Sequence, residues 1–336
     1  MKVFLTIWAI LALSLLSKAQ DIHFSQFFFA PQLLSPAEIG NFNAAYRFNA
    51  NQKTQWREVT QPYSTFDLTG DARLDFLTEG LAAGAVIMND RAGDSRFNTF
   101  SILLGGSYIY TLPENDRHSF TGGIQTGLTQ IKLNYDELQF NNQFNGVVYD
   151  PSLPNGENFA RNARWYLNLN FGITYRFRVN DRKTLSIGYA GHNVTTPDQS
   201  FFNDTGVNLP YRSSIYVTAD WQFTDEMDVM PVFRWMDQST FNETIFGSAV
   251  RYRIIDEGSL YRAAFLGYYG RFGDSGIAMI GAEIDAWRVA ASYDINVSDL
   301  EVASRNQGGF EFSVQYLIGR RSDSRGYRHK FCPVFL

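Results

Sequence analysis

Strict alternation of apolar and polar residues constrains this chain more than any other feature of its sequence. Between Trp165 and Phe177 every second residue is apolar, and residues such as Asn168, Thr174 and Arg176 stand between them. Successive side chains of a β-strand point to opposite faces, so this pattern predicts a strand that is oily on one face and polar on the other. The same alternation returns at residues 215–223, 287–295 and 310–318. We therefore expect an all-β chain.

The number and length of the strands favour a transmembrane barrel. Several candidates run for twelve residues or more, which is long for a soluble sheet and suits a tilted strand that crosses a bilayer. The sequence offers fifteen candidate strands, and the first two are the least regular. We therefore expect about fourteen antiparallel strands. The candidates are 43–50, 52–58, 63–75, 80–89, 97–111, 117–132, 164–179, 183–193, 211–223, 227–237, 243–255, 259–272, 276–285, 286–296 and 307–319.

A soluble β-sandwich or jelly roll is the alternative fold. It would bury one face of each strand, yet Arg, Asp and Asn recur along the polar faces, where they would be costly to bury. A barrel places them in its lumen instead. Connections are of two kinds: short ones such as 180–182, 224–226 and 256–258 are typical of periplasmic turns, and long ones such as 139–163 and 193–210 of surface loops.

The first residues resemble a signal peptide. Lys2 precedes an apolar run from Val3 to Leu16, and Ser17-Lys18-Ala19 provides small residues at the positions that signal peptidase reads. A transmembrane anchor is the competing interpretation, but the run is short for a span of about 20 residues. The sequence predicts cleavage after residue 19 and export to the outer membrane.

Composition and motifs exclude several functions. The single cysteine, Cys332, permits no internal disulfide, and a net charge of -5 argues against nucleic-acid binding. The four histidines, His23, His118, His192 and His329, are scattered, and no catalytic, metal-binding or cofactor-binding motif accompanies them. We expect a protein that is not an enzyme, although a hydrolase with a Ser-His pair built from distant residues stays an open alternative.

Residues 20–40 do not follow the strand rhythm. Pro31 and Pro36 oppose regular strand pairing, and the aromatic run at Phe27, Phe28 and Phe29 is too apolar to lie in water. These side chains must pack inside the barrel as a plug, against its rim, or on a partner protein. The sequence does not choose among the three, but packing within the protein is the commoner fate of such clusters.

The same region resembles the PorP/SprF family of type IX secretion system outer-membrane proteins of the Bacteroidetes. The first family motif falls on Asp21, Phe24, Ser25, Gln26 and Phe27, the second on Pro36, Ala37 and Gly40, and the third on Gln55 and Trp56, followed by a block containing Thr65 and Asp67. Ser35 and Lys53 stand where the family usually has Asn and Arg. The Cys332-Pro333 pair near the C-terminus is also similar to the usual family ending.

The resemblance implies a component of the type IX secretion and gliding machinery. Such proteins contact periplasmic and outer-membrane secretion components, or assist the export and display of large surface proteins or adhesins. The expected organisation is a signal peptide (1–19), a motif segment acting as plug or rim latch (20–40), an outer-membrane barrel embedded in lipid (41–319) and a basic periplasmic tail (320–336). The motif segment and the tail are hypothetical partner contacts, and a passive channel or porin is the alternative function.

Overall fold

The computed structural model describes residues 23–55, 61–93, 95–113, 115–135, 138–157, 161–180, 182–202, 206–257, 260–297 and 307–319. The predictions made for the signal peptide, for Asp21 and Trp56, and for the tail at 320–336 lie outside these residues.

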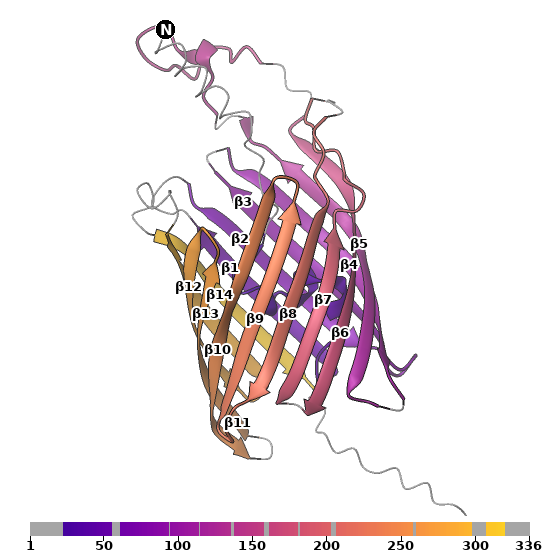
Figure 1. The fold of residues 1–336 in the computed structure, drawn as a ribbon. Coiled ribbons are helices and arrows are strands. Elements are labelled where there is room, and N and C mark those ends of the chain that lie inside the picture. The colour runs from indigo at the N-terminus through magenta and orange to yellow at the C-terminus, as the bar shows by residue number, and fades with distance from the viewer. Residues whose placement is uncertain are drawn as a thin grey trace, which may run out of the picture.

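Within the described residues, fourteen antiparallel strands close into a barrel, and β1 pairs with β14 to complete it (Figure 1). This confirms the predicted fold class. The strands are β1 (Tyr46–Gln55), β2 (Tyr63–Arg73), β3 (Leu81–Ala92), β4 (Phe97–Thr111), β5 (His118–Lys132), β6 (Ala163–Asn180), β7 (Lys183–His192), β8 (Arg212–Gln222), β9 (Met227–Gln238), β10 (Phe241–Glu257), β11 (Leu260–Arg271), β12 (Ser275–Ile284), β13 (Trp287–Asn296) and β14 (Gln307–Ile318).

The prediction of two separate strands at 43–50 and 52–58 was wrong, because β1 runs without a break through residue 51. Asn49, Asn51 and Lys53 face the lumen and are buried there. Gln52 and Thr54, on the other face, are also polar. With polar residues on both faces, the alternation that marks a strand disappears at this point.

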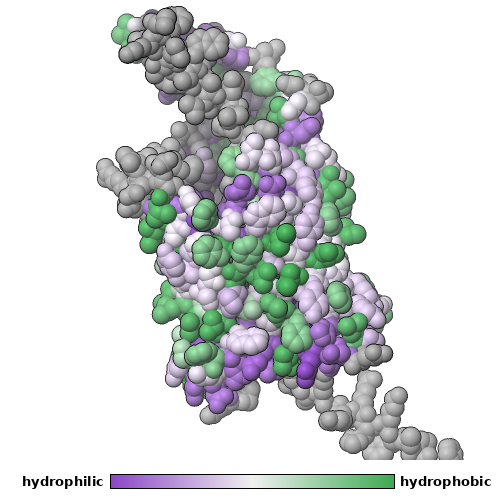
Figure 2. Space-filling model, in the orientation of Figure 1, coloured by the Kyte–Doolittle hydropathy of each residue, from purple (hydrophilic) through white to green (hydrophobic). Residues whose placement is uncertain are grey.

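The outer wall is apolar around the barrel. Leu104, Ile124, Ile173 and Leu266 are each exposed to 60% or more on the outward faces of their strands. Figure 2 shows apolar side chains spread over the middle of the visible wall and hydrophilic ones gathered toward its lower rim. This is the surface that a bilayer requires of a barrel that crosses it. Among the described residues, no helix combines the length and the hydrophobicity that crossing a membrane demands.

The two ends of the barrel differ. Connections 74–80, 112–117, 223–226 and 285–286 are short and lie at one end, here named the turn end. The opposite end, named the loop end, carries the long connections 133–162 and 193–211, the first of which contains η5 (Asn141–Gln143). The loop end is at the top of Figure 1.

A segment that precedes β1 lies within the barrel (Figure 1). It contains η2 (Phe27–Phe29), α2 (Pro31–Leu34) and η3 (Pro36–Glu38). Residues 23–40 are named the plug. Its first residues contact the loop-end halves of β1, β10 and β14, and its last residues approach the turn-end part of β1. The chain therefore descends through the lumen before it enters the wall.

Candidate functional site

The local conformation of the plug follows from its prolines, Ser35 and Gly40. Pro31 and Pro36 each occupy the first turn of a short helix, where the missing N–H costs nothing. The Ser35 hydroxyl accepts a hydrogen bond from the Ala37 N–H at 3.2 Å and so caps η3. Gly40 has a φ of 71°, which a residue without a Cβ adopts most easily. The second family motif is therefore a compact turn.

The first family motif is bound by a carboxylate of β14. The Ser25 and Gln26 N–H groups donate to the two oxygens of Glu311 at 2.6 and 2.9 Å. Lys53 on β1 forms an ion pair with the same carboxylate at 3.1 Å, and both side chains are almost fully buried. Removing one member of a buried pair leaves the other charge uncompensated, at a cost of about 3–5 kcal/mol. Glu311 is thus a principal attachment point of the plug.

A charged network surrounds this attachment point near the loop end. His23 forms an ion pair with Glu243 at 2.7 Å, and Arg271 contacts Glu243 at 3.0 Å and Asp294 at 3.2 Å. Arg234 also forms an ion pair with Glu243. The Ser25 hydroxyl donates to Asp294 at 2.7 Å. Strands β9, β10, β11 and β13 are therefore linked to the start of the plug through alternating charges.

The phenylalanines of the plug create an apolar core inside the lumen. Phe27 and Phe29 are buried, and the ring of Phe28 lies in a tilted contact with Tyr269 of β11, with 5.6 Å between the ring centroids. Arg234 lies over the ring of Phe27 and Arg288 over the ring of Phe29, each at 4.9 Å. The wall residues that complete this cluster are apolar: Tyr216, Met230, Ile245, Ala249, Phe265, Tyr269, Ile277, Met279 and Ala290. The inner faces of β8 to β13 therefore carry apolar side chains as well as the charged residues that the alternation predicts there.

The second half of the plug is fixed by Glu38. Its carboxylate accepts hydrogen bonds from Tyr216 at 2.7 Å, from Thr174 at 3.1 Å and from Asn41 at 2.9 Å. Arg47 donates to the Glu38 carbonyl at 2.7 Å and forms a bidentate pair with Asp71. Because Asp71 also accepts the Gly40 N–H at 2.8 Å, one ion pair orders the end of the plug and the start of β1.

Glycines on the inner wall provide the space for the plug. A Cβ added to Gly123 of β5 would lie 2.3 Å from the Pro36 carbonyl oxygen, and one on Gly172 of β6 would lie 2.1 Å from the Ser35 hydroxyl. Both separations are far below van der Waals contact, so a larger residue at either position would displace the backbone turn of the second motif.

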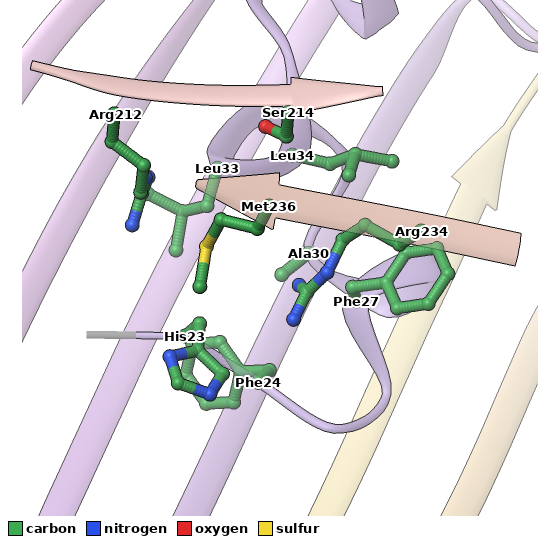
Figure 3. A pocket seen from close by; sticks show the side chains of 10 residues that line it. All are labelled: His23, Phe24, Phe27, Ala30, Leu33, Leu34, Arg212, Ser214, Arg234 and Met236. Carbon is green, nitrogen blue, oxygen red and sulfur yellow. The ribbon is translucent and has the colours of Figure 1, made fainter. Parts of the chain in front are cut away.

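A groove lies beside the plug at the loop end, between it and strands β8 and β9 (Figure 3). Figure 3 shows His23, Phe24 and Leu33 on the plug side and Arg212 and Met236 on the wall side. Its volume of about 20 Å³ has room for little more than one water molecule. Polar and apolar side chains therefore fill most of the groove, and it has no space for a ligand larger than a water molecule.

The structure brings most of the described motif residues together. Phe24, Ser25, Gln26, Phe27, Pro36 and Ala37 are buried in the lumen. Asp67 is also fully buried on the inner face of β2, and Thr65 donates to Asp90 at 2.6 Å. Gln55 lies apart, at the loop-end limit of β1. Their suggested role as partner contacts stays a prediction.

Sequence reasoning missed the residues of the wall that bind the plug. Glu311 and Asp294 were visible as polar members of alternating strands, and Glu38 as an acid between the second-motif residues Ala37 and Gly40. The signal that could have found these residues is a carboxylate on the inner face of a strand, in a chain that also has a segment rich in aromatics. Their partners could not be identified in this way, because plug and wall residues that pair are distant in sequence. Among the described residues, no cluster of three metal-binding side chains occurs.

The chain was compared with solved structures, with curated proteins and with protein families. Among solved structures, the chain is similar to the Pseudomonas putida toluene transporter TodX, with 12% identity, a TM-score of 0.49 and coverage of 88% of this chain and 94% of that one. It is also similar to a Pseudomonas aeruginosa FadL homologue, with 12% identity, a TM-score of 0.42 and coverage of 84% and 92%. None of the curated proteins matches the chain.

A family model gives a more specific result. The model described as type IX secretion system membrane protein PorP/SprF matches residues 16–316. This span includes all the described residues of the plug and thirteen complete strands. The chain belongs to the PorP/SprF family of type IX secretion system membrane proteins.

Proposed function

We propose that this outer-membrane barrel is a non-enzymatic component of the type IX secretion and gliding machinery. It anchors periplasmic components of the apparatus, or assists the secretion and surface display of particular large proteins or adhesins. The cleaved signal peptide predicted at residues 1–19 delivers it to the outer membrane. The family membership supports the general role, and the properties of the lumen support the choice of an anchor over a channel.

The observation that carries this proposal is the filled lumen. The plug contacts β13 and β14 through Ser25 and Gln26, β5 and β6 through Ser35 and Pro36, and β8 through Glu38. These strands lie on different sides of the closed barrel. A segment bound to the wall on all these sides leaves little room for the diffusion of solutes, so we place the function in protein contacts.

Conductance and co-purification test the proposal together. In planar bilayers the purified protein is expected to show no large ohmic steps. Gentle solubilisation from native membranes is expected to recover periplasmic type IX components or one large surface protein. A barrel that conducts strongly and comes without companions would contradict the anchor function.

The turn end and the basic tail form the proposed periplasmic contact. The tail has five basic residues, Arg320, Arg321, Arg325, Arg328 and Lys330, and it follows β14 where that strand ends at the turn end. Basic segments bind acidic protein surfaces and anionic lipid headgroups. Deletion of residues 320–336 is expected to weaken recovery of the periplasmic components. Unchanged recovery and secretion would exclude the tail as the contact.

A passive channel is the second candidate, and a cavity between the plug and the wall favours it. This cavity, of about 180 Å³, lies on the turn-end side of the plug. Transient release of the plug would open a lumen lined by charged residues. Rare conductance steps that disappear when the plug is cross-linked to the wall would favour this candidate.

A further inference from the structure

The cavity on the turn-end side of the plug has an unusual lining, and it is named the chamber. One wall is apolar and includes Leu34 of the plug with Met230, Val232 and Met279. The other carries Arg47, Arg176 and Arg288 with two carboxylates, Glu38 and Asp220. A cavity that opposes apolar side chains to a few convergent charged groups has the properties of a small-molecule site.

Both carboxylates of the chamber are already engaged. Glu38 accepts three hydrogen bonds, from Tyr216, Thr174 and Asn41. Asp220 forms an ion pair with Arg251 at 3.2 Å. Neither group therefore depends on a ligand for its stabilisation. The donors to Glu38 are neutral, so its negative charge still acts across the chamber on Arg176, as does that of Asp220.

Two of the three arginines are neutralised by acids outside the lining. Arg47 forms its bidentate pair with Asp71, with distances of 3.0 and 2.7 Å. Arg288 contacts Glu283 at 3.1 Å and lies over the rings of Phe29 and Phe265. These two guanidinium groups thus have stable counter-ions in the protein.

Arg176 differs from both. It donates to the Ser186 hydroxyl at 3.1 Å and to the Asn41 carbonyl at 3.4 Å, which are neutral acceptors. Among the described residues, no ion pair involving Arg176 is found within 4.0 Å. A guanidinium is always charged and offers five N–H donors in a planar fork that matches a carboxylate. Arg176 therefore faces the chamber with donors left over. The carboxylates of Glu38 and Asp220 act on its charge from elsewhere in the chamber lining, but neither forms an ion pair with it.

We propose that the chamber binds a small carboxylate that carries an apolar tail. The carboxylate pairs with Arg176, and the tail lies against Met230, Val232 and Met279. A free short-chain acid and the C-terminal end of a peptide share this chemistry. The inference does not depend on the secretion role, because it rests on the chamber alone.

Calorimetric titration of the full protein in nanodiscs tests the proposal, with empty nanodiscs as the blank. Hexanoate is the probe, and hexan-1-ol is its neutral counterpart of similar length. We expect hexanoate to bind at least about tenfold more tightly than hexan-1-ol, because the charge-assisted pair with Arg176 is lost in the alcohol. Absence of binding by hexanoate, or equal binding of the two probes, would overturn the proposal.

Three variants locate the site. Arg176→Gln removes the proposed counter-ion, and Val232→Phe fills the apolar side, so each is expected to weaken hexanoate binding about tenfold or more. Arg178→Gln is the matched control, because it lies on the same strand and face but does not line the chamber. Wild-type affinity in Arg176→Gln would overturn the assignment. Heat-modifiable migration in gels verifies that each variant folds. If Arg176→Gln does not fold, Val232→Phe and the comparison of hexanoate with hexan-1-ol still test the proposed site.

A peptide arm distinguishes the two sources of the carboxylate. Acetyl-leucyl-leucine is titrated beside its C-terminal amide. Tighter binding of the free peptide than of hexanoate, with loss of binding in the amide, supports a peptide end as the occupant. Tighter binding of hexanoate supports a short-chain acid. Failure of both carboxylates to bind rejects the site and leaves the proposed anchor function untouched.

Discussion

At the scale of single residues, two adjacent glycines of β5 have different surroundings: Gly123 faces the plug, and Gly122 is exposed on the outer face. A Cβ at Gly123 would meet the backbone of Pro36, whereas one at Gly122 would have nothing within 4 Å. Alanine suits a strand better than glycine by about 0.5–1 kcal/mol, so Gly122→Ala is expected to be neutral or stabilising. Gly123→Ala is expected to destabilise by about 1–3 kcal/mol, because the plug must move. Urea unfolding measures both, and equal stabilities would contradict the close contact of plug and wall.

A second residue-scale prediction concerns Glu311. Replacing it by Gln removes the negative charge that pairs with Lys53. It also replaces one of the two oxygens that accept hydrogen bonds from the Ser25 and Gln26 N–H groups. The free energy of unfolding is expected to fall by about 3 kcal/mol, because Lys53 stays buried without its counter-ion. Glu79→Gln, in an exposed turn, is the control and should leave stability unchanged. A small effect of Glu311→Gln would show that the plug is attached mainly by its apolar side chains.

At the scale of elements, closure of the barrel depends on the pairing of β1 with β14. Ala50 lies directly opposite Val314 in this pair, while Tyr316 is displaced by two residues. Opposed side chains on one face have Cβ atoms about 4.5–5.5 Å apart, so small backbone adjustments allow a disulfide. In a Cys332→Ser background, Ala50→Cys with Val314→Cys is expected to cross-link on oxidation. Preferential cross-linking of Ala50→Cys with Tyr316→Cys would show a different register.

Most elements could be predicted from the sequence because alternation survives wherever one face meets lipid. The strands at 165–177, 215–223, 287–295 and 310–318 are clear examples, and each lies within an observed strand or extends one residue beyond it. The alternation fails in β1, where Gln52 and Thr54 place polar groups on the outer face. It also misleads on the inner faces of β9 to β13, where Met230, Phe265 and Ile277 are apolar because they pack on the plug.

At the scale of the whole molecule, the location of the plug could not be predicted from the chain alone. The sequence shows that the aromatic run must pack somewhere, but a plug, a rim latch and a partner contact each satisfy that requirement. The choice depends on Gly123, Gly172, Glu311 and Tyr216, which all face the lumen and lie against the plug. These residues come from strands that are far apart in sequence, and only closure of the barrel brings them around one segment.

The orientation of the whole barrel in the membrane gives the last prediction. Short turns face the periplasm and long loops face outward in outer-membrane barrels. In a Cys332→Ser background, Val147→Cys lies in the long connection of the loop end, where the native side chain is 83% exposed. We expect a membrane-impermeant maleimide to label this variant in intact cells.

Glu79→Cys is the matched position at the turn end, where the native residue is also exposed. It is expected to react only after the outer membrane has been permeabilised. Labelling of Glu79→Cys in intact cells, with Val147→Cys protected, would reverse the orientation. It would also remove the turn end as the proposed periplasmic contact, because its turns and the tail that follows β14 would then face the cell exterior.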